Sequence, residues 1–163
     1  MLFSKLGQKF KRQLILRQRF LTDGEKNMAR SVFAESLKLE GIRVVAHRLI
    51  LPNYAMSPNG HIYFNLKNWS DDFSKEGLGT QSWLIHELTH VWQIQQGISV
   101  IRKAMLNRRY RYVFEHGKQF LSYGVEQQAQ MVQDYYIRRA QDLDCSAYDA
   151  CLPFLETSTI KVS

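Results

Sequence analysis

Cysteine is scarce in this sequence: Cys145 and Cys151 are the only two among 163 residues, and no CxxC pair exists. Cysteine-based zinc fingers need such closely spaced pairs, so that class is excluded. The disulfide framework of a small secreted domain is excluded as well. We predict two reduced thiols, since a disulfide could join them only in a loop; in a helix, residues six apart lie too far from each other.

Long apolar runs are also missing. No stretch approaches the roughly 20 apolar residues of a membrane span, and basic residues interrupt the apolar ones near the N-terminus. We therefore predict no transmembrane segment and no signal peptide, and synthesis in the cytoplasm. Apolar residues near the N-terminus recur at helical spacing, which predicts an amphipathic helix within residues 1–20: Phe3, Leu6, Phe10 and Leu14.

The composition is that of a globular protein, with 45% hydrophobic and 23% charged residues. The length predicts a single domain spanning residues 1–163. The net charge is +7. Residues 1–30 hold eight Lys/Arg against two acids, and residues 98–121 hold six against one. This basic excess either attracts an anionic partner such as nucleic acid, membrane or cell-wall polymer, or forms a solvated face, which is the simpler interpretation.

The hydrophobic pattern predicts an α+β domain, mainly helical, with a small β-sheet. Thr22 and Glu25 have the spacing of a capping box and predict a helix start. Residues 61–66 alternate apolar with polar side chains, as in a half-buried strand. The expected elements are helices over residues 22–39, 81–96 and 124–143, strands over 42–51 and 61–66, loops over 52–60 and 68–80, and partial helix over 98–121.

The pentapeptide His86-Glu87-Leu88-Thr89-His90 falls within the expected helix 81–96. Two histidines four residues apart share one helix face, so both imidazoles can reach one zinc ion. Glu87 points about 100° away from His86 around the helix axis, where a carboxylate can act as general base toward a zinc-bound water. The alternative is two core histidines and a surface acid. The apolar character of the rest of the helix argues against it.

A hydrolytic zinc site needs a third protein ligand. A histidine six residues after His90 would indicate a metzincin, but Gln96 stands there, so that subclass is excluded. Glu126 is the best-placed ligand, because it lies in the first turn of the helix 124–143, where the helix dipole favours an anion. The other downstream candidates are His116, Asp134 and Asp142.

The residues from His86 to Gln93, with Glu126-Gln127-Gln128-Ala129, resemble a family of bacterial zincin-like metallopeptidase domains. These domains occur at the C-termini of VgrG spike proteins and beside Rhs-type proteins of the type VI secretion system. Residues 22–25 and 57–64 resemble further family segments, so the resemblance covers roughly residues 20–140. It implies a zincin-like fold with the small sheet beside the active-site helix. It also implies that His86, His90 and Glu126 bind Zn²⁺ and that Glu87 is the catalytic base.

The resemblance further implies a secreted toxin. Such an effector would travel on a VgrG- or Rhs-type carrier, act in the periplasm of a target cell and be opposed by a cognate immunity protein. Residues 61–65 would form the edge strand beside which the substrate lies. In related zincins an Asp four residues after the ligand Glu often orients a histidine; Gln130 stands there, so Asp71, Asp72 or Asp134 would take that role.

The sequence therefore predicts a zinc metallopeptidase that hydrolyses peptide bonds in a protein or a cell-wall peptide. Tyr63, His116 or Tyr123 would be the second donor to the oxyanion. The alternative is a non-catalytic zinc-containing protein whose basic surface binds nucleic acid or an envelope polymer. Residues 108–112 fit base stacking only loosely, so no specific nucleic-acid binding is expected. A third hypothesis is a toxin that acts through a partner surface rather than through the enzymatic site.

Overall fold

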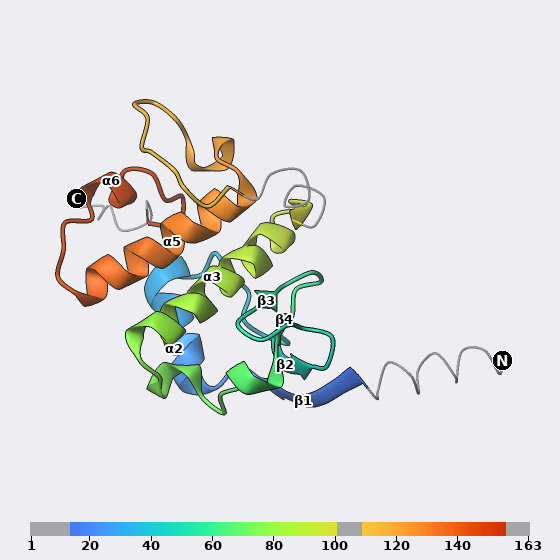
Figure 1. Cartoon of the computed structure of the whole chain (residues 1–163). Coiled ribbons are helices and arrows are strands. Elements are labelled where there is room, and N and C mark those ends of the chain that lie inside the picture. Colours follow the sequence, from blue (N-terminus) through green and yellow to red (C-terminus); the bar gives the residue numbers. More distant parts are fainter. Residues whose placement is uncertain (1–13, 101–108, 156–163) are drawn as a thin grey trace.

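The computed structural model describes residues 14–100 and 109–155 (Figure 1). These residues combine a small sheet with several helices, which confirms the α+β prediction. The strands are β1 (Ile15–Phe20), β2 (Arg43–His47), β3 (Ala55–Met56) and β4 (Ile62–Phe64). The helices are α2 (Asp23–Phe33), α3 (Leu78–Gln95), α5 (Val125–Ala140) and α6 (Ser146–Asp149), with 3-10 turns η1 (Leu66–Asn68), η2 (Phe73–Lys75) and η3 (Phe120–Ser122).

Helix α3 is central in this arrangement. In Figure 1 it lies between α5 on one side and the sheet on the other. Side-chain bonds link Gln81 to Tyr136 and Gln93 to Val125, so α3 and α5 run antiparallel. No described helix is both long and apolar enough to cross a membrane. The position of α3 explains why its residues are buried on nearly every side from Leu84 to Gln93.

The sheet has the strand order β1-β2-β4-β3. β1 pairs antiparallel with β2, β2 parallel with β4, and β4 antiparallel with β3. The alternation predicted for residues 61–66 is confirmed only over β4, where Ile62 and Phe64 are fully buried and Tyr63 is not. Leu66, which the pattern places on the buried face, is exposed in η1. The prediction that this strand forms the edge is wrong: β4 is interior. The edge on this side of the sheet is β3, a two-residue strand inside the segment expected to be a loop. It is too short to show an alternating pattern.

The N-terminal helix predicted for residues 1–20 is wrong over residues 15–20, whereas Leu14 is helical. Residues 1–13 lie outside the described residues, and Ile15–Phe20 form strand β1. Their backbone pairs with β2, with Phe20 opposite Arg43 and Ile15 opposite His47. The helical spacing of the apolar side chains stops at Leu14, and the pairing with β2 determines the structure of the residues that follow it.

The helices predicted over 81–96 and 124–143 are confirmed as α3 and α5, with shifts of up to three residues at their ends. Helix α2 ends at Phe33 rather than near residue 39, because Ala34 adopts a positive φ of 46° that breaks the helical repeat. Of the segment 98–121, residues 101–108 lie outside the described residues, and 109–119 run without a helix until η3. Cys145 and Cys151 are free, as predicted.

The capping box at the start of α2 is present. The Thr22 hydroxyl accepts from the Glu25 amide at 3.1 Å, and the Thr22 amide donates to the Glu25 carboxylate at 2.9 Å. The same carboxylate is fully buried and accepts two bonds of 2.7 Å from Arg19 and one of 2.8 Å from the Phe73 amide. Glu25 therefore joins β1, α2 and η2 through one side chain.

Gly24 is needed where α2 packs against η2. A Cβ atom at this position would overlap the side chain of Ser74. We expect Gly24→Ala to lower the free energy of unfolding by about 1–3 kcal/mol, the usual cost of overpacking, as measured by urea denaturation. Gly79→Ala is the control, because a Cβ there meets nothing within 4 Å; it should stabilise the protein by about 0.4–1 kcal/mol. Equal effects of both substitutions would contradict this packing.

Candidate metal centre

Two histidines of α3 and one glutamate of α5 converge. His86 and His90 lie one turn apart, and the Nε2 atoms of their rings are 3.4 and 3.3 Å from Oε2 of Glu126. One ligand atom from each residue lies within 4.8 Å of the others, so the cluster could hold a metal ion. Two imidazole nitrogens and one carboxylate oxygen are the donors that three-ligand catalytic zinc sites use.

Burial and hydrogen bonding set the charge of this cluster. All three side chains are buried. Burial alone would raise the pKa of Glu126, but the hydrogen bonds and charges of His86 and His90 outweigh it and lower this pKa to about 2. Burial would lower the pKa of His90, but Glu126 and Glu87 outweigh it, so the pKa of His90 is raised. Glu126 is therefore ionised at neutral pH, which is the form that binds a cation.

Glu87 lies beside the cluster. Its side chain is buried, and its Oε2 accepts a hydrogen bond of 2.8 Å from the Ser57 hydroxyl. Ser57 follows directly after the edge strand β3. The serine therefore holds the carboxylate from the side of the sheet, while α3 holds it from the side of the histidines.

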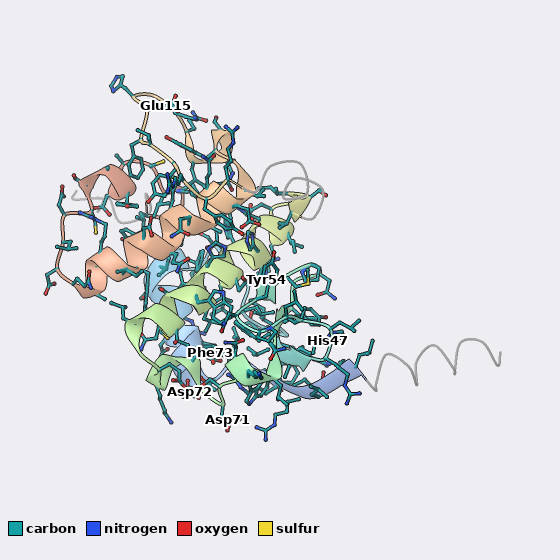
Figure 2. The ribbon with its side chains drawn as sticks, in the orientation of Figure 1. His47, Tyr54, Asp71, Asp72, Phe73 and Glu115 are labelled. Carbon is teal, nitrogen blue, oxygen red and sulfur yellow. The ribbon has the colours of Figure 1, made fainter. Side chains whose placement is uncertain are left out.

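A cavity of about 550 Å³ opens onto these residues, and Glu87 and the three members of the cluster all line it. Much of the rest of its wall is aromatic or apolar. These residues are Tyr54, Met56, Trp83, Val100 and Tyr110. Tyr54 and Met56 come from the β3 segment and are partly exposed; Figure 2 places Tyr54 near α3. The cavity can thus admit a ligand alongside the edge of the sheet.

No family model matches the chain. The chain is 36% identical over 141 residues to the type VI secretion system spike protein VgrG2b of Pseudomonas aeruginosa, an alignment that covers 79% of this chain and 14% of the spike protein. The solved effector domain of VgrG2b shares 34% identity with a TM-score of 0.72, over 83% of this chain and 82% of that chain. The chain belongs to the family of the VgrG2b effector domain. It spans only a small part of the whole spike protein.

In this VgrG2b-type effector domain, the other candidate metal ligands lie apart from the cluster. His116 is exposed in the segment before η3, and Asp142 is exposed in the turn after α5. Asp134 accepts hydrogen bonds from Tyr112 and Gln130 instead. Of the four candidates, Glu126 alone joins the histidines in the described structure.

The tyrosines predicted as oxyanion donors are engaged elsewhere in this effector domain. The hydroxyl of Tyr63 accepts from Asn59, and that of Tyr123 donates to the carbonyl of Val113. Neither residue lines the cavity, and His116 does not either. The tyrosines of the cavity wall are Tyr54 and Tyr110. The spacing of residues in the sequence could not predict these two tyrosines, because both lie in irregular segments far from the pentapeptide His86–His90.

The aspartates predicted to orient the histidines do not contact them. Figure 2 shows Asp71 and Asp72 beside Phe73, away from the facing stretches of α3 and α5. Asp71 accepts from Trp69, and Asp72 accepts from Thr22 and Ser74. Two glutamines take their place: Oε1 of Gln133 lies 3.0 Å from Nδ1 of His86, and Oε1 of Gln93 lies 2.8 Å from Nδ1 of His90.

Proposed function

We propose that this effector domain is a zinc-dependent metallopeptidase with a zincin-like active site. One observation carries the proposal: both histidines of the motif meet the carboxylate of Glu126 at the wall of a cavity that Glu87 also lines. His86, His90 and Glu126 would hold Zn²⁺. The buried, ionised carboxylate of Glu126 fits a cation, and the donor set is that of hydrolytic zinc enzymes.

Zinc held by these residues would supply a water with a pKa lowered toward about 7 and a Lewis acid for the substrate carbonyl. Glu87 takes the proton of the attacking water as general base and later delivers it to the leaving amine. Ser57 engages Oε2 of Glu87, so Oε1 is the oxygen assigned to the proton transfer. The hydroxyl of Tyr54 or Tyr110, both in the cavity wall, is proposed to donate a hydrogen bond to the oxyanion alongside the metal.

The substrate is proposed to be a protein or a cell-wall peptide. VgrG2b is a type VI secretion system spike protein, so homology to its effector domain supports delivery on a VgrG- or Rhs-type carrier. On this proposal the domain is a toxin that acts in the periplasm of a target cell, and a cognate immunity protein opposes it. Parallel assays on denatured protein and on purified peptidoglycan separate the two substrate classes.

Zinc content tests the metal site first. We expect about one zinc per chain by elemental analysis, and Glu126→Ala should weaken zinc binding by more than about 100-fold, beyond the cost of losing an outer hydrogen-bond partner. Glu40→Ala, at an exposed glutamate, is the control and should keep its zinc. A wild-type protein without zinc after its addition would contradict the proposal. Zinc binding without hydrolysis of either substrate class would favour the non-catalytic binding protein.

A further inference from the structure

Two glutamines contact the histidine nitrogens that face away from Glu126. Gln93 follows His90 by one turn of α3 and is fully buried. Gln133 follows Glu126 by two turns of α5 and reaches His86 across the helix interface. Each contact joins an amide oxygen to Nδ1 of an imidazole. Which ring nitrogen carries the hydrogen therefore depends on the direction in which each amide points.

The hydrogen bonds of Gln93 determine the direction of its amide. Its Nε2 lies 2.9 Å from the carbonyl oxygen of Val125, which can only accept. The second hydrogen on Nε2 goes to Oε1 of Gln128 at 2.9 Å, and Nε2 of Gln128 in turn donates to the carbonyl of Tyr123. Oε1 of Gln93 must then face the imidazole of His90. Since this oxygen only accepts, His90 carries its hydrogen on Nδ1.

The amide of Gln133 is oriented by a serine. Its Nε2 lies 3.3 Å from the hydroxyl of Ser82, and that hydroxyl donates its own hydrogen to the carbonyl of Gly79 at 2.8 Å. Ser82 can therefore only accept from Gln133, so Oε1 of Gln133 faces His86. His86 also carries its hydrogen on Nδ1.

We propose that Gln93 and Gln133 are positioning residues, which hold both histidines in the Nδ1–H form with Nε2 turned toward Glu126, ready to bind the metal. The inference rests on the proposed zinc site and adds the residues that prepare it. An amide accepts the hydrogen bond without adding negative charge, so Glu126 is the only anionic residue among the ligands and these two partners. Carboxylate partners would add further negative charge at the same places.

Gln93 has a second effect, because it joins the two halves of the site. Through the Val125 carbonyl and Gln128 it binds the first turn of α5, directly beside Glu126. The side chain of Gln93 therefore fixes both the orientation of the His90 ring and the position of the helix turn that carries Glu126. This network gives Gln93 and Gln128 a shared structural role, and the two residues belong to the two segments that carry the family resemblance, His86 to Gln93 and Glu126 to Ala129.

Zinc affinity, measured by competition with a chelator, tests the inference. We expect Gln133→Met, which keeps the length but removes the acceptor, to weaken zinc binding by about 10–100-fold. Gln133→Glu restores an acceptor and should keep an affinity close to that of the wild type. Gln130→Met is the matched control: Gln130 lines the same cavity from α5 but donates to Asp134 and not to a histidine. Gln93→Met should weaken zinc binding more than Gln133→Met does, because it also removes the hydrogen bonds that link Gln93 to α5.

Nitrogen-15 spectra of the imidazoles in the zinc-loaded wild type give a readout independent of activity. Both rings should show a protonated Nδ1 and a metal-bound Nε2, and a metal-bound Nδ1 in either ring would overturn the inference. Equal zinc affinity of the wild type and Gln133→Met would also overturn it and leave the proposed function standing. If Gln133→Met lowered the thermal stability without weakening zinc binding, Gln133 would contribute only to the packing of α3 against α5. Zinc binding with these effects but without hydrolysis would refute only the metallopeptidase.

Discussion

Glu87→Gln is expected to lower the rate of peptide hydrolysis by about 10²–10⁴-fold, the contribution of a well-placed general base, while zinc content stays unchanged. The amide keeps the size of the side chain and can still bond to Ser57, so the cavity should keep its shape. It cannot take a proton from water. Initial rates on denatured protein and purified peptidoglycan, with zinc measured in the same samples, give the result.

The control is Glu115→Gln, which changes an exposed carboxylate outside the cavity and should keep wild-type rates. Full activity of Glu87→Gln would refute the mechanism. Toxicity that survives this substitution after hydrolysis has been lost would instead support a toxin that acts through a partner surface. Rate and toxicity therefore need to be measured on the same variant.

Glu25→Ala should have the largest effect on stability, with a loss of about 3–5 kcal/mol in the free energy of unfolding. The substitution leaves the guanidinium of Arg19, which is mostly buried, without its bidentate partner. It also removes the acceptor of the Thr22 and Phe73 amides, so one change disconnects β1, α2 and η2. Urea denaturation followed by circular dichroism measures the loss.

Asp23→Ala is the matched control for Glu25→Ala. Asp23 lies in the same first turn of α2, but its side chain is almost fully exposed and its ion pair with Lys26 spans 3.4 Å. Exposed pairs of this kind contribute about 0–1 kcal/mol. A similar loss for both variants would mean that the acidic residues act through the helix dipole alone, and that the buried ion pair contributes nothing of its own.

Short-range patterns in the sequence were sufficient for the elements that carry the site. The spacing of His86 and His90 places both on one face of α3, and Thr22 with Glu25 marks the start of α2. Such patterns involve residues within one or two turns of each other, where helical geometry alone fixes the relation. The placement of Glu126 near a helix N-terminus was predictable for the same reason.

Longer-range relations were not predictable from spacing. Residues 15–20 form a strand because β2 lies beside them. Strand β4 is interior because β2 pairs with it on one side and β3 on the other, which leaves β3 at the edge. The aspartates chosen from the sequence were wrong for an equivalent reason. The partners of the histidines are set by which residues of α5 face α3, and this depends on the packing of the two helices.

The sequence by itself determined the residues that could bind a metal ion: two histidines on one helix face, a neighbouring carboxylate and a later glutamate at a helix start. Only the tertiary structure decided that Glu126 meets both histidines, that Ser57 bonds to Glu87, and that Gln93 and Gln133 contact the Nδ1 atoms of the rings. The physical reason is the range of the interactions. Helical periodicity is local, whereas the contacts across α3, α5 and the edge of the sheet exist only once these elements have packed together.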